Sequence, residues 1–187
     1  DRRIALKQIS WLMTETTAPE TRLWTPQGFR DDEWRHGEDA EALISNSKVI
    51  LPLQVVLGLD AQTRGNAKAR LGVLLMPGDP VETIADLLGD LALIALSFPA
   101  FNDGRSFSKA EILRRRYGFD RTVRAVGQVL IDQLPHMLRV GFDEFEVSHP
   151  LLLKRLEEGR LDGLPLYSQP SAKAANAGEK YSWRRRP

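Results

Sequence analysis

The sequence predicts an α/β protein with a parallel sheet, and three observations support this fold class. From Leu71 onward, short apolar segments alternate with helical patterns, joined by short links. The segment Leu91–Phe98 is apolar without alternation, which is typical of a central strand covered on both faces. The helical segments provide the crossovers that parallel strands need. We expect an open, doubly wound sheet. The alternative is a partial (βα) barrel, because four consecutive strand–helix units also make half a barrel.

The first third of the chain is the least regular part. Residues 23–29 place apolar residues on both sides of a Pro-x-Gly turn, which predicts a hairpin, and residues 39–45 predict a short helix. Val49–Leu57 predicts a strand in which Pro52 marks an edge position or a break. The polar segment Gly58–Arg70 predicts an exposed loop.

Four strand–helix units follow, with strands expected at 71–76, 91–98, 122–127 and 142–147. Asp79 and Pro80 have the chemistry of a helix start, and Ser108-x-x-Glu111 matches a capping box. A third helix runs from about residue 130 to Gly141 and contains Pro135, which should kink or split it. The last helix is expected from Leu151 to about residue 158. We therefore expect an irregular N-terminal segment (1–47), an α/β domain (48–165) and a basic flexible tail (166–187).

Composition excludes several classes of protein. The chain has 187 residues, with 26 Lys and Arg against 25 Asp and Glu, and this near-neutral balance argues against a nucleic-acid-binding protein. Cysteine is absent, which excludes disulfides, cysteine-ligated zinc and cysteine-held iron–sulfur clusters on this chain. The longest apolar run, Leu91–Phe101, is too short to span a membrane, and we expect a cytoplasmic protein. The tail from Ser171 carries a charge of +4, which suits a solvated end or an acidic partner.

The richest loop of the predicted sheet lies at the carboxyl edge, where ligands of such sheets bind. It contains an Asp103-Gly104 turn, then Arg105, a fork-shaped donor for oxyanions, followed by Ser106 and Ser108. Ser108 is expected to begin a helix, whose N-terminal amides favour anions. An oxyanion pocket is one interpretation of this loop. In the other, Asp103 pairs with Arg105, and Ser108 only caps the helix.

Arg124 is a charged residue on a strand expected to be internal, so it needs a partner. Asp103 and Asp132 are candidates for that partner, and the alternative makes Arg124 a second anion ligand beside Arg105. Asp103 and Asp132 are also the candidate acid–base residues. The run Arg114–Arg116 is expected on a solvated helix face. No dinucleotide, Walker A or nucleophile-elbow motif occurs, and the three histidines lack metal-ligand spacing, so we expect no cofactor and no metal.

The segment from Phe98 to Val147 resembles a bacterial family of unknown function described as involved in sulfite reduction. The family pattern is F-x-D-G-R-x-x-S, then L-R, R-A-x-G, D-Q and R-C-G-F-D. Val140 stands where that pattern often has Cys. The resemblance carries over to these positions: Phe101, Gly104, Arg105, Ser108, Arg124, Gly127, Asp132, Gln133, Arg139 and Gly141. It implies an oxidoreductase label and a sulfite or nitrite/sulfite reductase as neighbour or partner, without a defined reaction.

Three hypotheses remain open. The first is a cytoplasmic accessory protein of assimilatory sulfite reduction that binds a small oxyanion or a reductase at the carboxyl edge. The second is an enzyme acting on a phosphorylated or sulfonated small molecule. The third is a structural interaction protein without pocket chemistry. A pocket lined by Arg105 and Arg124 favours the first two, and pairing of both arginines with internal carboxylates favours the third.

Overall fold

The structure is a computed structural model that describes residues 21–100 and 102–161. Eight strands form one sheet in the order β2-β1-β8-β7-β6-β5-β4-β3. The strands are β1 (Arg22–Thr25), β2 (Gly28–Arg30), β3 (Trp34–His36), β4 (Lys48–Pro52), β5 (Leu71–Leu75), β6 (Leu93–Phe98), β7 (Thr122–Gly127) and β8 (Glu144–Val147). The helices are α1 (Ala42–Ser45), α2 (Leu53–Gly58), α3 (Ala61–Ala67), the 3-10 helix η1 (Val81–Asp90), α4 (Arg105–Arg115), α5 (Leu134–Val140) and α6 (Pro150–Glu157).

Six consecutive strands, β3 to β8, lie side by side and run parallel, and the β1–β2 hairpin adds two antiparallel strands beyond β8. The predicted α/β class with a parallel sheet is confirmed, and β6 is central and parallel to both β5 and β7. Of the two architectures left open, the strand order corresponds to the half-barrel, because each parallel strand lies beside its neighbour in the chain.

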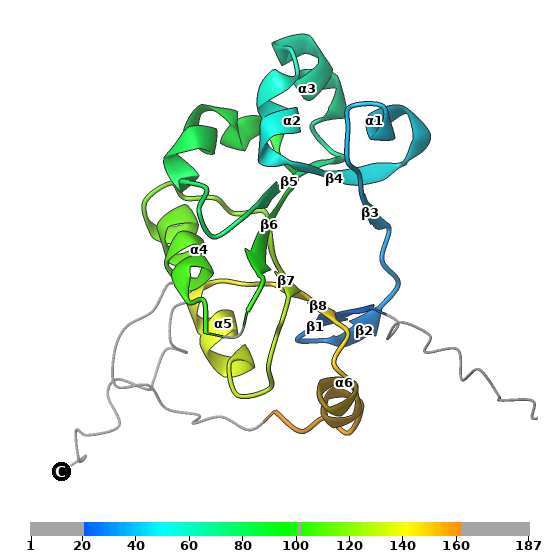
Figure 1. Cartoon of the computed structure of the whole chain (residues 1–187), viewed down its shortest axis with the longest axis vertical. Helices are drawn as coiled ribbons and strands as arrows, with labels where there is room; N and C mark the ends of the chain where they lie inside the picture. The colour runs from blue at the N-terminus through cyan, green and yellow to red at the C-terminus, as the bar shows by residue number, and fades with distance from the viewer. Residues whose placement is uncertain (1–20, 101, 162–187) are drawn as a thin grey trace, which may run out of the picture.

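A short connection forces the sheet to curl (Figure 1). β2 and β3 are consecutive in the chain but occupy opposite ends of the sheet order. Only residues 31–33 join them, and a chain of that length spans at most about 14 Å from Arg30 to Trp34. Eight strands in a flat sheet would be about 34 Å wide. The two edges of the sheet are therefore brought close together, and residues 31–33, which we call the strap, cross the opening of the half-barrel.

All described helices cover the outer face of this curled sheet. Their buried side chains belong to one hydrophobic cluster with alternate residues of the strands, among them Leu51, Val73, Ile94 and Ala125. The intervening residues Ile50, Leu93 and Ala95 form a separate cluster on the inner face, where Trp34 packs against them. A doubly wound sheet would have helices on both faces. Here the strap and Trp34 cover the inner face instead.

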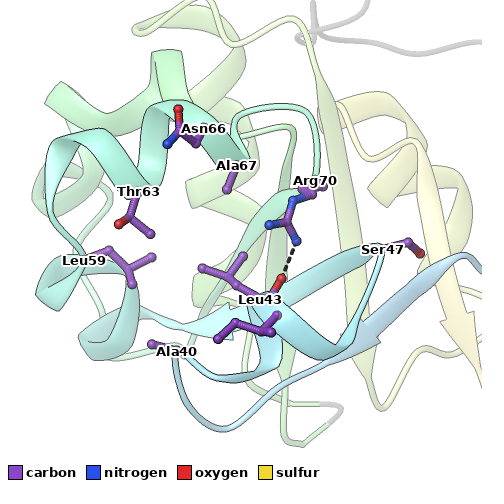
Figure 2. Close-up of a pocket in the computed structure, with 9 residues that line it drawn as sticks. Ala40, Leu43, Ser47, Leu59, Thr63, Asn66, Ala67 and Arg70 are labelled. Atoms are coloured by element: carbon purple, nitrogen blue, oxygen red, sulfur yellow. Dashed lines mark hydrogen bonds between the residues drawn. The ribbon is translucent and has the colours of Figure 1, made fainter.

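Several elements differ from the sequence prediction. Pro52 ends β4 and immediately precedes α2, so the expected strand 49–57 is a strand followed by a helix. The expected loop 58–70 contains α3, whose N-cap Asp60 accepts a hydrogen bond from the backbone N–H of Thr63 at 2.9 Å. Thr63, Asn66 and Ala67 of α3 face α1 across a groove (Figure 2).

A further difference concerns α4, which begins at Arg105 rather than at Ser108. Its N-cap is Gly104, without a capping side chain, so the expected Ser108-x-x-Glu111 capping box lies inside the helix. Pro135 does not kink α5, because it occupies the first turn of a helix that begins at Leu134. Phe101 and the tail from residue 162 lie outside the described residues. Within residues 21–100 and 102–161, no helix is long and apolar enough to cross a membrane.

Gly127→Ala should destabilise the fold strongly. Gly127 has a φ of 100°, and a Cβ at this position would lie 2.5 Å from the backbone oxygen of Phe98. We expect the free energy of unfolding in urea to fall by at least ~2 kcal/mol. Gly65→Ala is the matched control, because a Cβ there meets nothing within 4 Å inside α3, and it should raise stability by about 0.5–1 kcal/mol. Equal effects of the two substitutions would contradict this account.

Candidate functional site

Arg105, the predicted anion ligand, lies in the first turn of α4 and is engaged by Asp103. Its guanidinium donates two hydrogen bonds to that carboxylate, at 3.0 Å from Nε and 2.7 Å from Nη2. The hydrogen bond from Arg105 holds the pKa of Asp103 below its usual range, and the same pair raises the pKa of Arg105. The Arg105 side chain is 64% exposed, so the pair lies on the surface at the carboxyl edge of the sheet.

The two serines near Arg105 have different surroundings. Ser106 is buried, and its hydroxyl donates a 2.7 Å hydrogen bond to the backbone oxygen of Ser97 at the end of β6. Ser108 is exposed in the second turn of α4. Because the helix begins three residues earlier than expected, Ser108 is not at the N-terminus, and its capping role was wrongly predicted.

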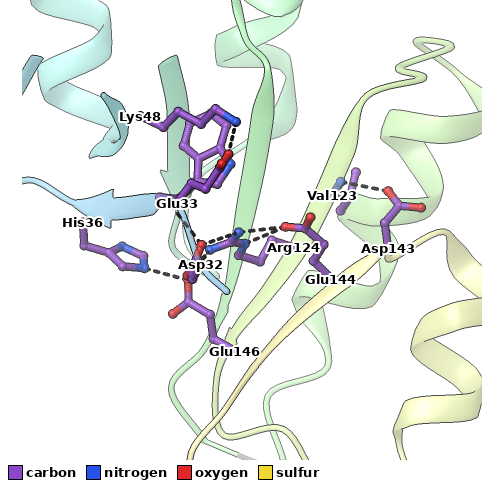
Figure 3. A network of polar contacts seen from close by, with 10 residues as sticks. Asp32, Glu33, His36, Lys48, Val123, Arg124, Asp143, Glu144 and Glu146 are labelled. Carbon is purple, nitrogen blue, oxygen red and sulfur yellow. Dashed lines mark hydrogen bonds and ion pairs between the residues drawn. The ribbon is translucent and has the colours of Figure 1, made fainter. Parts of the chain in front are cut away.

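Arg124 is completely buried on the inner face of β7 (Figure 3). Its guanidinium donates to both carboxylate oxygens of Asp32 in the strap, at 2.9 and 3.1 Å. It also donates to Glu144 at 2.8 and 3.0 Å and to Glu146 at 3.1 Å, both on β8. Burial lowers the pKa of Arg124, but the hydrogen bonds and charges of Asp32 and Glu144 outweigh burial and raise it overall.

The partners of Arg124 therefore differ from the predicted ones. Asp103 binds Arg105 instead, and Asp132 is exposed in the turn before α5. His36 on β3 extends the network with a 2.8 Å contact from Nε2 to Glu146. We call Asp32, His36, Arg124, Glu144 and Glu146 the inner-face network. It joins the strap and β3 to β7 and β8, which are not neighbours of β3 in the sheet.

Lys109 on α4 is a buried cation at the carboxyl edge that the sequence prediction missed. Its Nζ donates to the backbone oxygens of Met76 and, at 3.0 Å, Pro77, which follow β5. Burial lowers the pKa of Lys109, and this effect outweighs the opposing charges of Asp79 and Asp103. Because α4 begins at Arg105, its buried face consists of residues at helical spacing, namely Ser106, Lys109, Ala110 and Leu113. The sequence prediction began this helix at Ser108, so this face and the burial of Lys109 were not recognised.

The remaining family-pattern positions have structural contacts. Gly141 ends α5 with a φ of 115°, and Arg114 lies against it, donating hydrogen bonds to the Gly141 oxygen at 3.0 and 2.8 Å. Arg114 also pairs with Asp143, and its side chain is only 13% exposed, so its predicted solvated position was wrong. Arg139 contacts Nδ1 of His136 at 3.0 Å, and Gln133 is the N-cap residue of α5.

No cluster of metal-ligating side chains occurs among the residues that the structure describes.

Comparison with protein families gives a match over residues 72–177, more than half of the chain, to the family described as "Bacterial protein of unknown function (DUF934)". The chain belongs to the DUF934 family. Arg105, Lys109 and Arg124 lie within the DUF934 match, whereas Asp32, which binds Arg124, lies before it. A search of curated proteins finds no match.

Arg124→Leu should destabilise the protein far more than Arg105→Leu, its matched control. Removing Arg124 leaves three carboxylates together at the inner face, and we expect a loss of about 3–5 kcal/mol in the free energy of unfolding. Arg105 is mostly exposed, and its loss should change stability by less than ~1 kcal/mol. Urea unfolding followed by circular dichroism measures both. If Arg105→Leu lowered the free energy of unfolding as much as Arg124→Leu, the weak contribution expected of the Asp103–Arg105 pair would be contradicted.

The Lys109 ammonium should make the wild-type stability depend on alkaline pH. Because burial lowers its pKa, the unfolded chain keeps the proton at pH values where the folded chain has released it. The free energy of unfolding of wild type should therefore increase relative to Lys109→Met as pH rises from about 8 to about 10. Urea unfolding of both proteins across this range gives the difference, in which other titrating groups cancel. A difference that does not change with pH would refute the argument.

Proposed function

We propose that this DUF934 protein is a cytoplasmic accessory protein of assimilatory sulfite reduction, which acts by binding a sulfite or nitrite/sulfite reductase. The pairing of both candidate anion ligands with carboxylates of this chain favours a role through protein contacts over pocket chemistry, as the third hypothesis expects, and the resemblance to the family pattern is what points to a reductase as the partner. Arg124 is fully buried with Asp32, Glu144 and Glu146, and Arg105 is held by Asp103. An oxyanion would have to displace Asp32 from Arg124, whereas at Arg105 it would have to share the guanidinium with Asp103, which already takes Nε and Nη2.

The absence of cysteine is consistent with an accessory protein that binds the reductase and does not itself hold a cysteine-ligated iron–sulfur cluster. A chain without cysteine provides no thiolates for an iron–sulfur cluster, so in this proposal any such cluster belongs to the reductase. The sulfite-reduction role itself rests on the resemblance of the segment Phe98–Val147 to the family pattern. The accessory chain then acts on the reductase through its surface.

The carboxyl edge is the proposed contact with the reductase. Met76, 46% exposed, lies at the end of β5, and its carbonyl oxygen accepts a hydrogen bond from Lys109. Lys109 also interacts electrostatically with Asp103 and Arg105, which places the exposed Asp103–Arg105 pair in the same region. An exposed apolar side chain beside a surface ion pair suits a transient protein contact.

One observation favours the enzyme hypothesis. Lys109, with its lowered pKa, lies near Asp79, Asp103 and Arg105 at the edge where substrates bind in such sheets. In that case a phosphorylated or sulfonated substrate would compete with Asp103 for Arg105. Anion binding separates the two functions, because a role that acts by binding a reductase needs no small anion.

A growth test addresses the proposed function. A strain lacking the gene should fail to grow on sulfate or sulfite and grow normally on sulfide, because the block lies before sulfide. The wild-type gene should restore growth, and a gene carrying Met76→Asp with Arg105→Glu should restore it only weakly. Normal growth of the deletion strain on sulfate would refute the proposed role.

Thermal melts distinguish the accessory role from the enzyme. With millimolar sulfite, sulfate or phosphate, the wild-type melting temperature should stay unchanged, and Arg105→Lys should behave in the same way. A rise in the wild-type melting temperature that Arg105→Lys abolishes would favour the enzyme hypothesis, because lysine keeps the positive charge but lacks the planar guanidinium that binds an oxyanion through two hydrogen bonds.

A further inference from the structure

An open groove of about 640 Å³ lies between α1 and α3, away from the carboxyl edge (Figure 2). Its walls are mainly apolar, with Leu43 and Ile44 from α1 facing Leu59 and Ala67. Ile44 is 88% exposed, more than any other large apolar side chain in the described part of the chain. A large aliphatic side chain at the rim of an apolar groove marks an interaction surface.

Arg70 is a cation in the wall of this groove and pairs with no carboxylate among the described residues. Its Nη1 donates to the backbone oxygens of Leu43 at 2.5 Å and Asn46 at 3.2 Å, at the end of α1. Within the described residues, no hydrogen bond engages its Nε or Nη2. The guanidinium is thus held in position by α1 and keeps one edge for another acceptor.

A second hollow, of about 500 Å³, lies beside the groove, and Asn66 lines both of them. Lys68 and Arg121 line it, and Arg121 uses Nη1 to reach the backbone oxygens of Gly89 at 3.2 Å and Leu91 at 2.6 Å. No acidic residue lines either hollow. Arg70 and Arg121 directly precede β5 and β7, so this basic and apolar surface lies at the amino edge of the parallel sheet.

We infer that the groove and the neighbouring hollow bind an amphipathic, acidic helix of a partner protein. Apolar side chains of that helix would contact Leu43, Ile44 and Leu59, as in helix-in-groove recognition. Its carboxylates would pair with Arg70 and with Lys68 or Arg121. Charge complementarity carries this assignment, because cations line both hollows and no carboxylate is among the lining residues. The inference does not depend on the reductase proposed above.

Other occupants fit the charge less well. The segment Ser171–Pro187 of this chain carries +4 and would be repelled by the same cations. A second copy docking through the same face would bring two surfaces of the same basic charge together, with Arg70, Lys68 and Arg121 on each side.

The experiment uses the full chain and a fluorescein-labelled synthetic helix of about 18 residues, with leucines at helical spacing and glutamates on the flanking positions. A second peptide has lysine in place of every glutamate. By fluorescence polarisation, wild type should bind the glutamate peptide saturably below about 100 µM and the lysine peptide at least about tenfold more weakly. Ile44→Glu should weaken binding of the glutamate peptide at least about tenfold, and Lys68→Glu about threefold.

Leu151→Glu is the matched control, because Leu151 on α6 is 68% exposed and lies outside both hollows. It should bind the glutamate peptide like wild type. The inference is overturned if wild type does not bind the glutamate peptide. It is also overturned if Ile44→Glu binds that peptide as tightly as wild type does, because the peptide would then bind elsewhere, for example on the basic tail. A wild-type dimer in sedimentation that Ile44→Glu converts to a monomer would assign the groove to a second copy. Tighter binding of a peptide of residues 1–20 would assign it to that segment, and either result overturns the inference.

Discussion

The ion pair between Arg124 and Asp32 connects the middle of the sheet to the strap that crosses its opening. Arg124 stays charged at any relevant pH and is completely buried, so its environment must provide negative charge. Asp32 reaches it from the strap, and Glu144 and Glu146 reach it from β8. A conformation that opens the half-barrel would leave this buried guanidinium with fewer partners, and the closed form is stabilised accordingly.

The two arginines of the family pattern show how burial decides the role of a residue type. Both are bidentate with an aspartate, yet Arg124 is buried and Arg105 is 64% exposed. The same pairing therefore organises the interior at one position and forms a modest surface contact at the other. At the carboxyl edge, the cation that ties two elements together is Lys109, which joins α4 to the segment after β5.

The central strands were predictable because their signal is local. Leu91–Phe98 is apolar on both faces, and burial of all six residues of β6 follows from it. The start of α4 was missed because Ser108-x-x-Glu111 matches a capping box, while the true N-cap, Gly104, has no side chain to show it. Asp60-x-x-Thr63 did carry a local signal for α3, which the polar composition of residues 58–70 concealed. For the site, Asp103–Arg105 was foreseen as a pair two residues apart. Asp32 lies 92 residues from Arg124, and no local pattern connects them.

The pairing of β1 with β8 has a consequence for the order of folding. Arg22 lies opposite Val147, so the hairpin at one end of the sheet joins a strand made more than 120 residues later. During synthesis, residues 22–30 cannot pair with β8 until most of the domain has left the ribosome. The strands from β4 to β7, in contrast, pair with neighbours that are synthesised shortly before them. Long sequence separation slows such contacts, because a large loop must close before they form. We therefore expect the hairpin of β1 and β2 to dock last, on a parallel sheet that is otherwise nearly complete.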